Sequence, residues 1–204
     1  MKKKVLALIA VLSLATVTAC GQVNSAATLG DTTITQSSFQ ATIDELLKER
    51  ESVDQSQMQL EVGSALNRSQ LRFMVITTIF DEIAKELKIS VSKTDEATTR
   101  QSLIDQSGGE EALAQNLVAA QIAPSNFERY IRAIVVTEKL ADALEASGVS
   151  ADAVDFRITE LVNAKAKELK VTVNPRYGTW DYEAGDILAT DSAGDAIAPS
   201  QPTE

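Results

Sequence analysis

Apolar residues recur at helical spacing in the segment 71–87, and they cover more than one face of the helix that this spacing predicts. The apolar positions are Leu71, Val75, Ile76, Ile79, Phe80, Ile83 and Leu87. A helix that is apolar on several sides has to be covered by neighbouring elements. We therefore expect a central helix, beginning at Asn67 or Ser69, around which a mainly α domain is built.

Shorter elements are predicted on both sides of this segment. Extended pieces are expected at 27–29 and 32–34, where they flank the turn Gly30–Asp31 and predict a small hairpin, and again at 171–173. Helix boundaries are indicated by capping and helix-breaking residues. In chain order these are Thr35, Ser92 with Asp95 in a capping box, Gly108–Gly109, Pro124, Gly148 and Ser150.

The N-terminus has the layout of an export signal. Three lysines at positions 2–4 precede an apolar run over 5–15, which is too short for a membrane span of about 20 residues. The following Val17-Thr18-Ala19-Cys20 resembles the lipobox of bacterial lipoproteins, in which the cysteine is acylated and becomes the mature N-terminus. The resemblance implies a signal peptide over residues 1–19, a lipid on Cys20, and a linker over residues 20–26.

A lipid on Cys20 would make the protein a membrane-anchored lipoprotein on the extracytoplasmic face of the cell membrane. Two or three acyl chains would hold it firmly, because each buried CH₂ group contributes about 0.8 kcal/mol. The alternative is an ordinary secretory signal followed by an unmodified cysteine. The absence of a second cysteine to pair with Cys20 favours the lipid.

Composition argues against several kinds of chemistry. The formal net charge is −10, and removal of a signal containing three lysines makes the remainder more acidic, which disfavours nucleic-acid binding. The chain has no histidine and one cysteine, so neither a disulfide, a metal site nor thiol catalysis is expected. Adjacent acidic pairs such as Glu110–Glu111 point in different directions on a helix and fit solvated faces. We expect no cofactor other than the lipid.

The order of the predicted elements resembles the N-terminal chaperone domain of the SurA family, which PrsA-type lipoprotein foldases share and which is related to the chaperone part of trigger factor. The residues that carry the resemblance are the strand-like start 28–35, the helix end 84–92, the segment 108–113 and the helix start 124–127. The segment 173–181 resembles the ending of actinobacterial lipoproteins of this group. The resemblance implies a helical chaperone domain over residues 27–183 with a few short strands. The acidic tail over residues 184–204 has a composition that predicts disorder.

One departure from the full foldases bears on activity. In those proteins a parvulin isomerase domain lies between the two helices that correspond to 125–146 and to the helix opening at Ser150. Only Ser147-Gly148-Val149 separates them here, and the histidines of a parvulin site are missing. The resemblance therefore implies a chaperone module without isomerase activity, and we expect no enzyme.

Large apolar residues on two of the helices are candidates for contact with clients. Phe73, Met74, Phe127 and Tyr130 are expected either to line a groove for extended apolar segments or to belong to the core. Tyr177 and Trp180 are expected to pack the C-terminal segment onto the body.

The leading hypothesis is a membrane-anchored holdase whose partners are unfolded or newly exported polypeptides. The alternatives are an adaptor lipoprotein with one dedicated envelope partner and, with least support, a peptidyl-prolyl isomerase.

Overall fold

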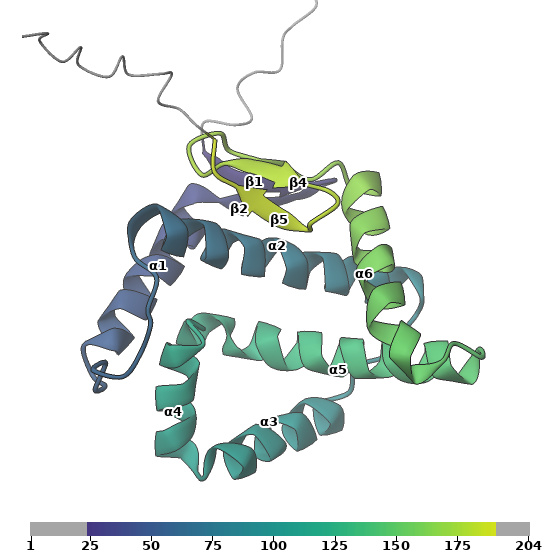
Figure 1. Ribbon diagram of the computed structural model, residues 1–204, viewed down its shortest axis with the longest axis horizontal. Helices are drawn as coiled ribbons and strands as arrows, with labels where there is room; N and C mark the ends of the chain where they lie inside the picture. The colour runs from purple at the N-terminus through teal and green to yellow at the C-terminus, as the bar shows by residue number, and fades with distance from the viewer. Residues whose placement is uncertain (1–23, 191–204) are drawn as a thin grey trace, which may run out of the picture.

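The computed structural model describes residues 24–190, and within them the chain is mainly α-helical with a few short strands, as predicted (Figure 1). The helices are α1 (Gln36–Arg50), α2 (Gly63–Glu86), α3 (Lys93–Ser107), α4 (Glu110–Ala119), α5 (Pro124–Ala146) and α6 (Ala151–Glu168). The strands are β1 (Ser25–Leu29), β2 (Thr32–Thr35), β3 (Thr172–Val173), β4 (Thr179–Asp181) and β5 (Asp186–Leu188).

The predicted hairpin is present and forms part of a three-stranded sheet in the order β2-β1-β3. Strands β1 and β2 are antiparallel, with Leu29 opposite Thr32 and Thr28 opposite Thr33. The turn between them begins at Gly30, whose φ of +55° suits glycine in a tight hairpin. Strand β3, which follows the last helix, pairs with the other edge of β1. The segment before the first helix and the segment after the last helix thus complete one sheet.

Three predicted boundaries are wrong. Strand β1 begins at Ser25, inside the expected linker 20–26, and Ser25 is buried. Helix α2 begins at Gly63 rather than at Asn67 or Ser69. Strand β5 lies inside the expected disordered tail 184–204, where Ile187 is buried and pairs with Trp180. The predictions for residues 1–19, for Cys20 and for residues 191–204 lie outside the described residues.

Helix α2 is the centre of the fold, as its apolar pattern predicts. It packs against α1, α5, α6, β1 and β5 (Figure 1). Leu71, Val75 and Ile79 on this helix are fully buried and belong to a core that includes Phe39 of α1 and Val136 of α5. The sheet covers α2 on the side away from α5.

Helices α3 and α4 form an arm, residues 93–119, that closes a triangle with α5 (Figure 1). The predicted capping box of Ser92 and Asp95 opens α3, and Gly108 ends it in the left-handed region at φ +89°. No residue of α3 is buried. Polar contacts help to hold it: Lys139 on α5 donates to Asp95 over 2.6 Å and to the carbonyl of Ser90 over 2.8 Å.

The connection between α5 and α6 contains only residues 147–150. Helix α6 packs against α2 and α5 and leads back to the sheet through β3. The segment after β3 returns to the body as expected, because Trp180 is buried and the ring of Tyr177 meets that of Phe39. Gly178 at φ +134° is required here, since a Cβ atom would lie 2.2 Å from the carbonyl oxygen of Leu188.

Candidate functional site

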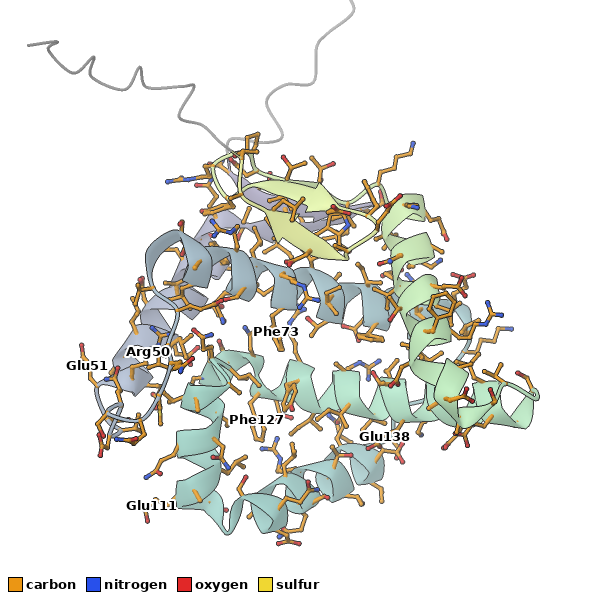
Figure 2. All side chains as sticks on the ribbon, in the orientation of Figure 1. Arg50, Glu51, Phe73, Glu111, Phe127 and Glu138 are labelled. Carbon is orange, nitrogen blue, oxygen red and sulfur yellow. The ribbon has the colours of Figure 1, made fainter. Side chains whose placement is uncertain are left out.

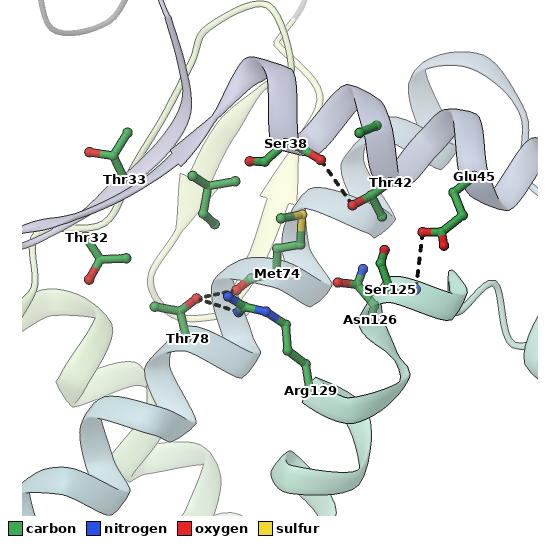
Figure 3. A pocket seen from close by; sticks show the side chains of 12 residues that line it. Thr32, Thr33, Ser38, Thr42, Glu45, Met74, Thr78, Ser125, Asn126 and Arg129 are labelled. Atoms are coloured by element: carbon green, nitrogen blue, oxygen red, sulfur yellow. Dashed lines mark hydrogen bonds between the residues drawn. The ribbon is translucent and has the colours of Figure 1, made fainter.

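A hollow lies between β2, α1, α2 and the start of α5, and we call it the β2 groove (Figure 3). Its volume is about 510 Å³. It is lined by Thr32, Thr33, Ile34, Ser38, Ala41, Thr42, Glu45, Met74, Thr78, Ser125, Asn126 and Arg129. Most of these side chains carry a hydroxyl, amide or charged group, and Ile34, Ala41 and Met74 are apolar. The groove therefore combines many polar groups with a larger share of apolar surface.

Hydrogen bonds fix most of the polar groups in the β2 groove. Glu45 accepts the backbone N–H of Ser125 over 3.2 Å at the positive end of the α5 dipole. Arg129 donates to the Thr78 hydroxyl over 3.3 Å, and that hydroxyl donates to the carbonyl of Met74 over 2.7 Å. A buried exception is Asn126, which is only 3% exposed and whose Nδ2 has no hydrogen-bond partner among the described residues.

A second hollow, the Phe73 cavity, lies between α2 and α5 and the end of α4. Its volume is about 280 Å³, and Phe73, Ile76 and Phe80 line it from one face of α2. All three are only half-buried. Gln70, at its wall, donates to the carbonyl of Gln121 over 2.6 Å, while its Oε1 has no partner among residues 24–190. This cavity offers apolar surface to a side chain entering from outside.

A third hollow, the Phe127 cavity, lies between the end of α1, helix α4 and the start of α5. Its volume is about 240 Å³, and its lining includes Leu117, Ile122, Pro124 and Phe127. The guanidinium of Arg100 on α3 lies 4.9 Å from the centre of the Phe127 ring, a cation–π contact that ties the arm to α5. The side chain of Phe127 lies inside the triangle of α3, α4 and α5, whereas Phe73 lies between α2 and α5 (Figure 2).

The four residues expected to contact clients are not brought together in one groove. Met74 is 7% exposed and forms part of the floor of the β2 groove, where it also belongs to the core. Phe73 and Phe127 line separate cavities. Tyr130 is half-buried and lines none of these three hollows. Their binding roles remain predictions, and the single apolar groove is replaced by three separate hollows.

The sequence did not predict the polar residues whose hydrogen bonds connect the segments around these hollows. Gln121 has a left-handed φ of +60°, and its Oε1 accepts both from Arg50 over 2.8 Å and from the backbone N–H of Glu61 over 3.1 Å. Arg50 is buried, and this burial lowers the pKa of its guanidinium, with partial compensation by the Glu61 carboxylate. Figure 2 places Arg50 at the end of α1. No motif marks Gln121 or Asn126, because their roles depend on which distant segments meet them.

Within residues 24–190, no three His, Cys, Asp or Glu side chains are grouped so that they could hold a metal ion. Lys139 and the backbone of Ser92 lower the pKa of Asp95 to about 2 by hydrogen bonding, but Asp95 caps a helix and lines none of the three hollows. In the same part of the chain, no helix has both the length and the hydropathy of a membrane span.

These features define a helical domain with shallow, separate hollows. The family model of the SurA-like N-terminal domain matches residues 1–141, and the chain belongs to this family. SurA-like domains bind unfolded polypeptides and are chaperone modules rather than catalytic ones, which gives the chain a chaperone-like role in general. The search of curated proteins found no match, and neither did the search of solved structures.

Proposed function

We propose that this protein is a membrane-anchored holdase that binds exported polypeptides before they fold, on the extracytoplasmic face of the membrane. The observation that carries the proposal is the membership in the SurA-like family together with two apolar hollows around half-buried aromatic residues. Phe73, Ile76 and Phe80 offer one such surface, and Phe127 offers another.

Separate shallow hollows suit weak and unspecific binding. A single apolar side chain of a client contributes only about 1.5–3 kcal/mol when it is fully buried. Simultaneous contact with the Phe73 and Phe127 cavities raises the apparent affinity without a tight individual site, because the second contact becomes intramolecular. A client that folds withdraws its apolar side chains and is released. This mode of binding needs neither ATP nor a cofactor.

Lipidation of Cys20 fits the geometry of the described chain. Strand β1 begins at Ser25, so the acylated residue would be followed by only a few residues, spanning at most about 17 Å, before the folded body. Both ends of the described chain lie at the sheet end of the molecule, and the arm of α3 and α4 lies at the opposite end (Figure 1). An anchor at Cys20 would therefore hold the sheet near the bilayer and direct the arm outward.

The absence of an inserted isomerase domain supports a holdase without isomerase activity. Residues 147–150 connect α5 directly to α6, and the chain contains no histidine. We expect no acceleration of prolyl isomerisation in a peptide assay. Clear catalysis by the full chain would contradict this part of the proposal.

The direct test is suppression of aggregation of a chemically unfolded model client by the full chain. We expect near-equimolar protein to slow light scattering, and Phe73→Ser and Phe127→Ser to weaken this effect several-fold. Phe156→Ser is the matched control, because Phe156 is 62% exposed on α6 and lines none of the three hollows. Unchanged aggregation at equimolar protein would contradict the holdase.

A further inference from the structure

Among residues 24–190, no strand pairs with the outer edge of β2. The sheet order β2-β1-β3 places β2 at one edge, and Thr32, Thr33 and Thr35 are exposed. Proteins commonly protect such edges with charged residues, proline or a covering element. Strand β2 contains only threonine and isoleucine, which favour strands, and its edge borders the β2 groove.

The register identifies the backbone groups that face the groove. The hairpin turn contains two residues, and Leu29 and Thr32 flank it as the first pair. Pairs alternate along an antiparallel ladder, so the next pair, Thr28 and Thr33, directs its N–H and C=O groups away from the partner strand. Apart from the hairpin itself, no backbone–backbone hydrogen bond of the described chain involves Thr33. Its donor and acceptor are available at the free edge.

The opposite wall of the groove presents a second available donor. Asn126 sits in the first turn of α5, and its Nδ2 is buried without a partner among the described residues. Figure 3 shows its amide between Met74 on α2 and Thr42 on α1, at the side of the groove away from Thr32 and Thr33. Burying an amide donor without a partner is unfavourable, so a ligand that brings a carbonyl oxygen there removes an existing penalty.

We propose that the β2 groove binds an extended polypeptide segment as an added strand on β2, with a carbonyl group of the segment or of one of its side chains accepting from Asn126. The occupant is a client in extended conformation, so this inference rests on the proposed function. Strand addition recognises the backbone and therefore tolerates many sequences. The apolar cavities around Phe73 and Phe127 would bind apolar side chains of the client, whereas the β2 groove would bind its main chain.

Other occupants fit this groove less well. A bound helix has its backbone groups paired internally, so it would leave the edge of β2 and Thr33 unsatisfied. A second copy of this acidic chain, with a formal net charge of −10, would be opposed by electrostatic repulsion. A wholly apolar ligand would leave the buried Asn126 amide without a partner.

The test is binding of a fluorescent peptide of alternating Thr and Val, with a lysine at each end, to the full chain. Thr33→Pro removes the outward N–H, at a position where an edge strand tolerates proline. We expect it to weaken binding at least about threefold, the usual effect of one lost hydrogen bond. Thr33→Val keeps the N–H and should stay within about twofold of the wild type. Asn126→Leu should weaken binding without lowering thermal stability. If Asn126 had only a structural role, the substitution would lower thermal stability instead.

The same peptide with N-methylated backbone amides keeps its side chains and should bind much more weakly. Equal binding of both peptides, or equal binding by the Thr33→Pro and Thr33→Val variants, overturns strand addition. If Thr33→Pro does not fold, the methylated peptide and Asn126→Leu decide the question. Concentration-dependent dimers that disappear in Thr33→Pro would identify a second copy as the occupant and overturn the proposal. If strand addition fails these tests but the protein still suppresses aggregation, the proposed holdase function is unaffected.

Discussion

The ring of Phe39 meets the ring of Tyr177 edge-on, with centroids 5.0 Å apart and an interplanar angle of 72°. Phe39 belongs to the first helix and is fully buried, whereas Tyr177 follows the last helix. The family match ends at residue 141, before α6 begins. The part of the chain beyond the match nevertheless completes both the sheet, through β3, and the core around α1.

This aromatic contact predicts a measurable coupling between the two ends of the chain. Phe39→Ala should lower the free energy of unfolding by about 3–5 kcal/mol because it leaves a cavity in the core. Tyr177→Ala should have a smaller effect. The double variant should reveal a coupling of about 0.5–1.5 kcal/mol. Urea unfolding followed by the fluorescence of Trp180, the only tryptophan, measures all three. Strict additivity would contradict a direct contact.

Gly178 should tolerate alanine far less well than another glycine of positive φ. A Cβ at Gly178 would meet the carbonyl oxygen of Leu188, whereas one at Gly109, with φ +122°, would meet nothing within 4 Å. Gly109→Ala should therefore show only the backbone penalty of this nearly glycine-only conformation, about 1–3 kcal/mol. Gly178→Ala should lower the free energy of unfolding by clearly more than Gly109→Ala does, and it should disrupt the pairing of β4 and β5. Equal thermal shifts of the two variants would contradict the close approach.

Gln121 should stabilise the fold through its side chain. Gln121→Ala leaves the buried guanidinium of Arg50 without one of its acceptors, and an unpaired buried charged donor costs about 1–3 kcal/mol or more. Gln106→Ala is a suitable control, since Gln106 is exposed on α3 and bonds only to Ser102. Denaturant midpoints of the two variants test the difference. A Gln121→Ala midpoint equal to that of the control would show that Arg50 finds another partner.

Asp95 should make stability depend on pH in the acid range. Lys139 and Ser92 lower the pKa of this carboxyl from its ordinary 3.8 to about 2 by hydrogen bonding. The contribution is therefore present above about pH 4 and is lost as the pH falls towards 2. Asp95→Asn should be less stable than the wild type at neutral pH, and the difference should vanish near pH 2. Thermal melts across this range measure it, and Lys139→Met should remove most of the effect. A difference that persists at pH 2 would contradict the assigned cause.

The local signals of the sequence predicted the fold well where a single segment determines its own structure. The hairpin at Gly30, the capping box at Ser92 and the helix start at Pro124 all depend on neighbouring residues, and all three are present. The start of α2 was missed because Val62, which precedes it, makes no side-chain capping hydrogen bond. Strand β5 was missed because its stability comes from pairing with β4 and from the burial of one residue, Ile187.

The candidate site was less predictable for the same reason. Large apolar residues on helices can be recognised in the sequence, but their division between core and cavity depends on the packing of other helices. Met74 and Phe73 are neighbours in the chain, yet they face different hollows. Asn126 carries no sequence signal, because its unpaired amide is recognisable only once β2, α1 and α2 surround it.

Photocrosslinking in living cells tests the central claim most directly, because it reports which surfaces touch clients. A photoreactive residue at position 73 or 127 should crosslink to many polypeptides of different sizes. Positions Glu111 and Glu138, which are exposed outside the three hollows, serve as controls and should crosslink weakly (Figure 2). A single discrete product from position 73 or 127, or equal crosslinking from all four positions, would contradict the account.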